Sequence, residues 1–111
     1  MRYLFVCSAG RNRSPTAARI SRQLAREYKI KGYEADFSGI DHIAMYPATL
    51  RAFDRIFVMS NDLEGEIKDL TDKPVVNLDV QDTSIRERKM RELLERELQE
   101  KLTPIMKELA R

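Results

Sequence analysis

The sequence predicts an α/β protein with three layers, in which helices cover both faces of a four-stranded parallel sheet. Short apolar runs that are typical of buried strands alternate along the chain with segments whose apolar residues recur at helical spacing. Strands separated by helices need crossover connections, which favour parallel pairing. The chain has 111 residues, the size of one ordinary domain, so we treat residues 1–111 as a single domain.

The first strand and the first helix are expected at the start of the chain. Residues 2–7, RYLFVC, form a short β-prone run. In the segment that follows, Pro15 suits the first turn of a helix, where its missing N–H costs nothing. Ile20 and Leu24 continue at helical spacing, and Gly32 is a suitable stop. A strand that leads directly into a helix is therefore predicted here.

Two further strand and helix pairs are expected in the middle of the chain. Residues 33–39 alternate in polarity and end in Ser-Gly, as a strand does, and residues 47–53 begin with proline and predict a short helix. The run RIFVM at 55–59 is the clearest buried strand, because no polar residue interrupts it. A helix over 60–70 follows, with its apolar residues on one face.

The last strand and the last helix are predicted from residue 74 onward. PVVNLDV at 74–80 indicates a fourth strand, and from about Ile85 to Arg111 the apolar spacing is helical again. Pro104 is expected to kink this helix or to split it in two. Charged residues of both signs recur along this helix at i,i+4 spacing, which is typical of a solvent-exposed face. Its apolar stripe belongs to the core or, if the helix projects beyond the sheet, to a dimer interface.

The composition argues against several classes of protein. Apolar residues make up 42% and charged residues 34%, which is typical of a globular rather than a disordered chain. The net charge of +2 does not by itself predict nucleic-acid binding, and one cysteine cannot form an internal disulfide. No apolar run approaches the roughly 20 residues of a membrane span. MRYLFV is too short for a signal peptide, so we expect a cytoplasmic protein without membrane or nucleic-acid partners.

The only cysteine, Cys7, ends the first predicted strand, and a basic loop links it to the first helix. Ligands of open α/β sheets bind beyond the carboxyl ends of the strands, and N–H groups at a helix start have no helical partners. The loop therefore predicts an anion site, in which Arg13 can hold two phosphate oxygens with its planar fork. The expected phosphate-binding residues are Ser8, Ala9, Gly10, Arg11, Asn12, Arg13 and Ser14.

In such a loop Cys7 is expected to act as a nucleophile. Cysteines at helix N-termini near arginines have thiol pKa values of roughly 3.5 to 7.5, and the Ser14 hydroxyl can also donate to the sulfur. A thiolate that faces a bound phosphoryl group attacks phosphorus, while Arg13 and the loop amides stabilise the transition state. The alternative is an inert buried thiol at a strand end, which is common for free cysteine.

The segment FVCSAGRNRSPTA resembles the phosphate loop of the low-molecular-weight protein tyrosine phosphatases, in which Cys-x5-Arg after a strand is followed by Ser-Pro. DFSG, FDRIFVMS and LDVQD resemble the segments of the family's second, third and fourth strands, in that order. The resemblance covers the whole chain, which is shorter than typical members mainly between strands 2 and 3. It implies the strand order 2-1-3-4 and a metal-independent phosphomonoesterase that needs no cofactor and works through phosphocysteine.

The resemblance also implies a general acid after the fourth strand. The family has an aspartate followed by proline there, which best matches Asp82, although Thr83 replaces the proline. Asp79, three residues earlier, is the alternative, and both residues also suit loop solvation or turn capping. One carboxylic acid can protonate the leaving oxygen and then activate the water that attacks phosphocysteine.

Three loop positions depart from the family pattern. Gly10 stands where typical members have asparagine, so the tie from the strand-2 serine, here Ser38, is expected to be absent. Asn12 stands where many members have a second cysteine, so Cys7 has no internal disulfide partner, which argues against thioredoxin-coupled arsenate reduction. Arg11 replaces the apolar rim residue usual in tyrosine-directed members. It favours an acidic substrate or is merely solvated.

Two ring side chains outside the loop, Tyr46 and His42, are further candidates for a role in the site. Tyr46 is either an aromatic wall of the pocket or a half-buried surface tyrosine. His42, the only histidine, has no metal-ligating residues near it in the sequence and is expected to face solvent.

Together these observations predict a cysteine-dependent phosphomonoesterase with Cys7 as nucleophile, Arg13 as phosphate-binding group and Asp82 as acid. Its substrate would be a phosphorylated protein or a small phosphomonoester, with inorganic phosphate as product and inhibitor. One alternative is a phosphate- or phosphoprotein-binding module with negligible turnover. Another is a carrier that passes a phosphoryl group from cysteine to a partner, which fits the Arg-Ser-Pro motif less well. The sequence leaves the oligomeric state open.

Overall fold

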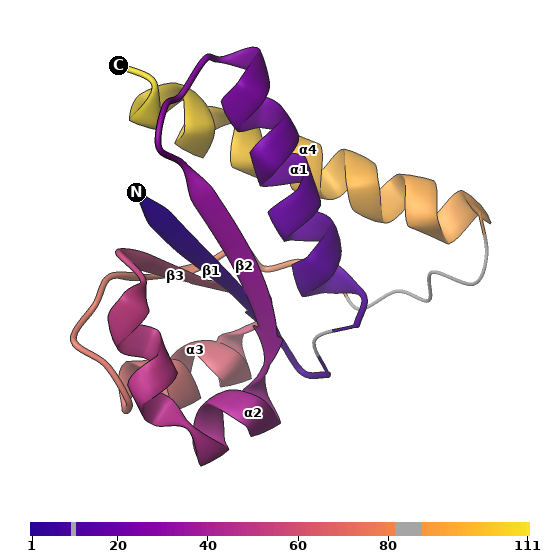
Figure 1. The fold of residues 1–111 in the computed structure, drawn as a ribbon. Helices are drawn as coiled ribbons and strands as arrows, with labels where there is room; N and C mark the ends of the chain where they lie inside the picture. The colour runs from indigo at the N-terminus through magenta and orange to yellow at the C-terminus, as the bar shows by residue number, and fades with distance from the viewer. Residues whose placement is uncertain (10, 82–87) are drawn as a thin grey trace.

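The computed structural model describes residues 1–9, 11–81 and 88–111, which Figure 1 shows as a ribbon. Within these residues four strands form one sheet in the order β2-β1-β3-β4, and every neighbouring pair is parallel. The strands are β1 (Arg2–Cys7), β2 (Glu34–Gly39), β3 (Arg55–Val58) and β4 (Val75–Asn77). The predicted parallel pairing and strand order are both confirmed.

β1 lies in the interior of the sheet and determines where the functional edge is. It pairs with β2 as far as Cys7, which lies opposite Gly39, and with β3 on its other side, where Val6 lies opposite Val58. All residues of β1 except Arg2 are buried. Because the strands run in one direction, their carboxyl ends meet at one edge of the sheet. Cys7 therefore lies at the carboxyl end of an inner strand of the sheet and not of an edge strand.

Helices cover both faces of the sheet, as the sequence predicts. Figure 1 shows α1 and α4 over one face, and α2 and α3 over the other. The helices are α1 (Arg13–Glu27), α2 (Ile40–Met45), the 3-10 helix η1 (Pro47–Ala52), α3 (Asn61–Lys68) and α4 (Arg88–Leu109). Among the described residues, no helix is both long enough and apolar enough to cross a membrane.

Alternating side chains of β1 supply two separate cores. Tyr3 and Phe5 join Cys7 in the cluster formed with α1 and α4, whereas Leu4 and Val6 join the cluster formed with α2, η1 and α3. This division follows from the two-residue period of a strand, which sends successive side chains to opposite faces. The sulfur of Cys7 thus lies on the same face of the sheet as the helix that follows it.

The first helix ends earlier than Gly32. α1 stops at Glu27 because Lys29 has a φ of +56° and the N–H of Ile30 returns to the carbonyl of Ala25 at 2.8 Å. Such a left-handed residue after a helix satisfies its last carbonyls. Gly32 has a φ of +69° and belongs instead to the turn that leads into β2.

Two short helical elements follow β2. The short helix predicted over 47–53 is confirmed as the 3-10 helix η1, whereas α2 (Ile40–Met45) was not predicted. Only Ile43 of α2 is buried. A helix of six residues with one buried side chain carries too little periodicity for a sequence pattern to reveal.

The two elements nearest the end of the chain also differ in extent. β4 ends at Asn77 instead of residue 80. The N–H groups of Leu78 and Val80 still donate hydrogen bonds to the carbonyls of Val58 and Met59, at the end of β3. α4 is not split at Pro104 and continues to Leu109. Leu102 and Met106, on either side of the proline, are both 0% exposed. Their packing offsets the roughly 3 kcal/mol that a proline costs inside a helix.

The packing of α4 on the sheet can be tested at Leu98, which is 0% exposed. Leu98→Ala is expected to lower the free energy of unfolding by about 2–5 kcal/mol, because it removes buried methyl groups and leaves a cavity. Leu93→Ala on the same helix removes a side chain that is 52% exposed and should cost less than about 0.5 kcal/mol. Urea denaturation measures both values, and equal effects would contradict the packing described here.

Candidate active site

The predicted nucleophile lies at the carboxyl end of β1, directly in front of α1. Cys7 is 3% exposed, and its Sγ atom lies 3.1 Å from the Oγ atom of Ser14. Ser14 is itself 0% exposed and belongs to the first turn of α1. A hydroxyl that donates to sulfur stabilises the thiolate more than the thiol. With the Ser14 hydroxyl as the donor, this contact favours the thiolate form of Cys7.

The predicted phosphate-binding arginine is buried beside the same loop. Arg13 is 5% exposed, and its Nη1 atom donates to the carbonyl of Val80 at 3.0 Å. Its Nη2 atom lies 3.4 Å from the hydroxyl oxygen of Ser8. The guanidinium therefore connects the two ends of its own loop and links this loop to the chain that follows β4. A buried charge needs such partners, and they hold the planar fork in one orientation.

The start of α1 is suited to an anion. Its N-cap residue, Asn12, makes no side-chain hydrogen bond to the helix, and the first turn contains no acidic residue. Thr16 instead donates to the Asn12 carbonyl through both its N–H and its hydroxyl. Helix N-termini carry partial positive charge and N–H groups without helical partners. An anion at this position would meet the helix dipole without competition from a neighbouring carboxylate in that turn.

A second helix begins at the same edge of the sheet. Ser60 precedes α3, and Asp62 lies in its first turn. The Ser60 hydroxyl and the N–H groups of Asp62 and Leu63 hold the pKa of the exposed Asp62 carboxyl below its ordinary value, and the charge of Arg13 acts in the same direction. The starts of α1 and α3 therefore both lie at the carboxyl edge of the sheet, after the neighbouring strands β1 and β3.

The chain beyond β4 is held in place residue by residue. Lys101 of α4 donates to the carbonyl of Asp79, Arg13 donates to the carbonyl of Val80, and the N–H of Gln81 donates to Glu97 of α4 at 3.1 Å. Asp79 has a φ of +50°, a conformation that aspartate adopts more readily than most residues. Its N–H donates to the side chain of Asn77 at 2.8 Å, which supports this bend.

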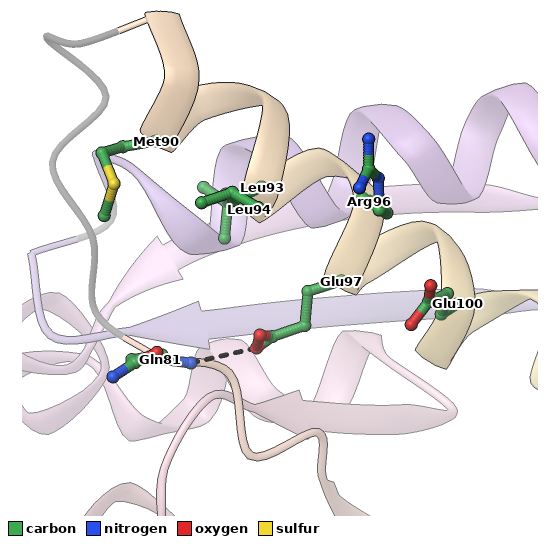
Figure 2. A pocket seen from close by; sticks show the side chains of 7 residues that line it. All are labelled: Gln81, Met90, Leu93, Leu94, Arg96, Glu97 and Glu100. Atoms are coloured by element: carbon green, nitrogen blue, oxygen red, sulfur yellow. Dashed lines mark hydrogen bonds between the residues drawn. The ribbon is translucent and has the colours of Figure 1, made fainter.

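Figure 2 shows a hollow between this segment and α4, and the dashed line marks the bond between Gln81 and Glu97. The hollow is lined by Gln81 and by residues of α4, namely Met90, Leu93, Leu94, Arg96, Glu97 and Glu100. The amino-terminal half of α4 thus borders the chain where it leaves Gln81 toward position 82.

The structure brings together most of the residues that the sequence singled out. Cys7, Ser8, Arg13 and Ser14 are linked by the contacts given above, while Ala9 and Arg11 are exposed in the same loop. Two predicted residues, Gly10 and Asp82, lie outside the described residues. Asp79, the alternative acid, is exposed, and its carbonyl is the group engaged by Lys101.

The structure also places Tyr46, His42 and Ser38, which lie outside the loop after β1. Tyr46 is 56% exposed and its ring centroid lies 5.2 Å from that of His42. Ser38 donates its hydroxyl to the carbonyl of Gly39 at 3.2 Å. In the part of the chain that the structure describes, no cluster of three or more histidine, cysteine, aspartate or glutamate side chains could hold a metal ion.

Three contributors to the site were missed at the level of sequence. These are the Val80 carbonyl that binds Arg13, and the side chains of Glu97 and Lys101 that hold the segment after β4. A backbone carbonyl leaves no trace in a sequence pattern. Glu97 and Lys101 stand among many other charged residues of α4, so nothing in their spacing distinguishes them.

Several solved structures share this fold. A mutant of YwlE from Bacillus subtilis aligns with a TM-score of 0.80 at 17% sequence identity, covering 100% of this chain and 99% of its own. A YwlE arginine phosphatase mutant with a phosphorylated active-site serine gives 0.79 at 16%, covering 98% and 95%. The tyrosine phosphatase Wzb from Escherichia coli K30, in complex with phosphate, gives 0.77 at 14%, covering 97% of each chain.

No protein-family model and no curated protein sequence matches the chain. The likeness to the solved phosphatases extends over nearly the whole of both chains, and the strand order is the one that the resemblance implies. The chain therefore has the fold of the low-molecular-weight phosphatases. At 14–17% identity this likeness concerns the fold, and function must be argued from the site itself.

The contact between Ser14 and Cys7 makes a measurable prediction. Ser14→Ala is expected to slow alkylation of Cys7 by iodoacetamide several-fold near pH 6, because the thiolate loses a hydrogen-bond donor and less of it is present. The rate is measured as a function of pH by mass spectrometry, and the whole profile should move to higher pH.

Ser21→Ala provides the matched control. Ser21 lies on the same helix and is also 0% exposed, but its hydroxyl donates to the Ala18 carbonyl. This variant should leave the alkylation profile of Cys7 unchanged. Equal profiles for Ser14→Ala and the unaltered protein would refute the proposed effect of Ser14 on the sulfur.

Proposed function

We propose that the protein is a cysteine-dependent phosphomonoesterase that uses Cys7 as nucleophile and needs no metal ion. The observation that carries the proposal is the arrangement of Cys7, Ser14 and Arg13 around the start of α1. A sulfur beside a hydroxyl, a buried guanidinium and an uncapped helix N-terminus are the parts that nucleophilic attack on a phosphoryl group requires.

In the first step the phosphoryl group of the substrate occupies the loop from Ser8 to Ser14. The Cys7 thiolate attacks phosphorus opposite the leaving oxygen, so that an S–P bond forms while the P–O bond breaks. Arg13 and the amides at the start of α1 neutralise the negative charge that is spread over the equatorial oxygens. An aspartic acid gives its proton to the leaving oxygen, which departs as an alcohol.

In the second step water releases the phosphate from Cys7. The aspartate that has lost its proton takes one from water, and the hydroxide that develops attacks phosphorus as the S–P bond breaks. The thiolate is regenerated beside Ser14, and inorganic phosphate leaves the loop. Since the product occupies the same groups as the substrate, phosphate is expected to inhibit the reaction.

We assign the acid to Asp82, with Asp79 as the alternative. Asp82 follows Gln81, whose N–H is held by Glu97, and Val80, whose carbonyl is held by Arg13. These bonds fix the chain immediately before Asp82 relative to the phosphate loop, which favours an acid with a defined position. Asp79 is exposed, and its φ of +50° serves the bend that brings Val80 to Arg13.

We expect the substrate to be a phosphorylated protein or a small phosphomonoester. The solved structures of this fold include both arginine and tyrosine phosphatases, so the fold itself does not select between these phosphorylated groups. Arg11 is exposed beside the loop, in contrast to the buried Arg13. A cation at this rim would favour substrates that carry additional negative charge.

The central test is a rapid-mixing assay with an aryl phosphate in the presence of a chelator. The unaltered protein should release a stoichiometric burst of the aryl alcohol, followed by slower turnover. Cys7→Ser should abolish both phases but still bind phosphate, because the loop amides and Arg13 remain. Dependence on a divalent ion, or full turnover by Cys7→Ser, would refute the mechanism. Phosphate binding without any burst would identify a binding module instead.

The same assay separates the two candidate acids. Asp82→Asn should reduce kcat about a hundredfold or more, the range in which general acid–base catalysis contributes. Asp79→Asn should change kcat by less than about threefold. The reverse order of effects would move the role of the acid to Asp79.

A further prediction concerns the bond that holds the chain before Asp82. Glu97→Ala removes the acceptor of the Gln81 N–H and should lower kcat about tenfold, whereas the inhibition constant of phosphate should change by less than about twofold. Glu100→Ala is the matched control, since Glu100 lies one turn further along α4 and is not bonded to this segment in the described residues. Equal losses in the two variants would argue against a positioning role for Glu97.

A further inference from the structure

A second hollow lies at the opposite edge of the sheet, where β1 and β3 begin. It has a volume of about 470 Å³, within the range of small-molecule sites. Tyr3 of β1, Arg55 of β3 and Ile105 and Leu109 of α4 contribute to its lining. Figure 1 shows that the end of α4 lies at this end of the sheet, away from the loop after β1. Cys7 lies four residues further along the strand than Tyr3, or about 13 Å away.

The hydroxyl group of Tyr3 is the most unusual feature of this hollow. Tyr3 is 2% exposed. Its ring packs edge-on against Tyr33, with ring centroids 5.4 Å apart, and in a tilted arrangement against Phe57, with centroids 4.8 Å apart. The Tyr33 hydroxyl donates to Ser21, but among the described residues none forms a hydrogen bond with the Tyr3 hydroxyl. A buried hydroxyl without a partner is uncommon in folded proteins and calls for a physical explanation.

Arg55 places a positive charge beside this hydroxyl. Its guanidinium carbon lies 5.8 Å from the centre of the Tyr3 ring, and it forms no ion pair with another described residue. Glu108, which also lines the hollow, and Asp54, which precedes Arg55 in the chain, each have another partner. Asp54 accepts the N–H of Arg2 at 2.7 Å, and Glu108 lies 3.7 Å from Arg111. The hollow thus offers a hydrogen-bond donor and a cation next to each other.

The remaining walls of the hollow are mainly apolar. Ile105 and Leu109 are half-buried and pack against the core between α4 and the sheet, and Met1 is 50% exposed at the rim. Pro104 lies next to Ile105 and presents a ring without an N–H. The hollow therefore combines apolar side chains with the polar groups of Tyr3, Arg55 and Glu108.

We propose that this hollow binds a small amphipathic carboxylate, such as a medium-chain fatty acid or an aryl carboxylic acid. The carboxylate accepts hydrogen bonds from the Tyr3 hydroxyl and from Arg55, whose planar fork matches a carboxylate. The apolar body lies against Ile105 and Leu109. The ligand satisfies the unpartnered hydroxyl and pairs the guanidinium, and neither effect depends on the chemistry at Cys7.

The experiment is an NMR titration of the ¹⁵N-labelled protein with octanoate, in phosphate buffer so that anions do not compete at the loop after β1. The amides of Tyr3, Arg55 and Leu109 should shift in a saturable manner. Octan-1-ol, which lacks the charge, should bind at least tenfold more weakly. Phenylacetate in place of octanoate shows whether the hollow prefers a chain or a ring.

Three variants test the assignment of the polar groups. Arg55→Gln should weaken octanoate binding about tenfold, and Tyr3→Phe about threefold, while Arg51→Gln, which alters an exposed arginine of η1, should leave it unchanged. Tyr3→Phe keeps the ring that packs in the core. Its melting temperature should equal or exceed that of the unaltered protein, because it removes a buried hydroxyl without a partner.

Four results would overturn the proposal. One is the absence of saturable shifts at the three amides, and another is equal binding of octanoate and octan-1-ol. A third is octanoate binding that neither Arg55→Gln nor Tyr3→Phe weakens. A fall in the melting temperature of Tyr3→Phe is the fourth, because it would mean that the hydroxyl is already hydrogen-bonded within the fold. None of these outcomes depends on whether Cys7 is catalytic.

Discussion

The burial of the Arg13 guanidinium constrains the arrangement of the whole carboxyl edge of the sheet. A charge that is only 5% exposed must be matched by hydrogen bonds, and one of them comes from the carbonyl of Val80 on a different segment. That carbonyl can reach Arg13 only because the chain leaves β4 at Asn77 and bends at Asp79, where φ is +50°. The loop after β1 and the segment after β4 therefore form one structural unit, and neither can move without breaking a buried bond to a charge.

The topology explains why several elements converge at this edge. From β1 the chain passes over one face of the sheet through α1 to β2, and after β3 it continues into α3 on the other face. Two helices that leave adjacent parallel strands toward opposite faces open a crevice between their N-termini, and open α/β sheets bind ligands at such points. A phosphoryl group placed there would meet the positive end of the α1 dipole, whereas the first turn of α3 carries the carboxylates of Asp62 and Glu64.

The sequence was informative where a residue acts through its own chemistry or its spacing. The buried strand at 55–59, Pro15 at the start of a helix and the distance from Cys7 to Arg13 all left local signals, and the resemblance of the loop supplied the strand order. The sequence could not indicate α2, because six residues with one buried side chain have no clear period. Of the two effects expected of Pro104, the split of the helix is wrong, because packing on both sides of the proline is a tertiary effect. The partners of Arg13 and Gln81 lie 67 and 16 residues away from them, so only the folded chain shows them.

An arginine lies near each end of β1, Arg13 at the carboxyl end and Arg55 at the amino end, but the two have different partners. At the carboxyl end the partners of Arg13 are the Ser8 hydroxyl and the Val80 carbonyl, and the sulfur of Cys7 lies beside the Ser14 hydroxyl. At the amino end Arg55 lies over the Tyr3 ring, and within the part of the chain that the structure describes neither the Tyr3 hydroxyl nor the Arg55 guanidinium has a hydrogen bond or an ion pair. The rings of Tyr3, Phe57 and Phe5 pack in sequence between these ends, with centroids 4.8 Å and 5.0 Å apart. Because a close-packed row of rings resists deformation, we expect an anion at one edge to leave the geometry at the other unchanged.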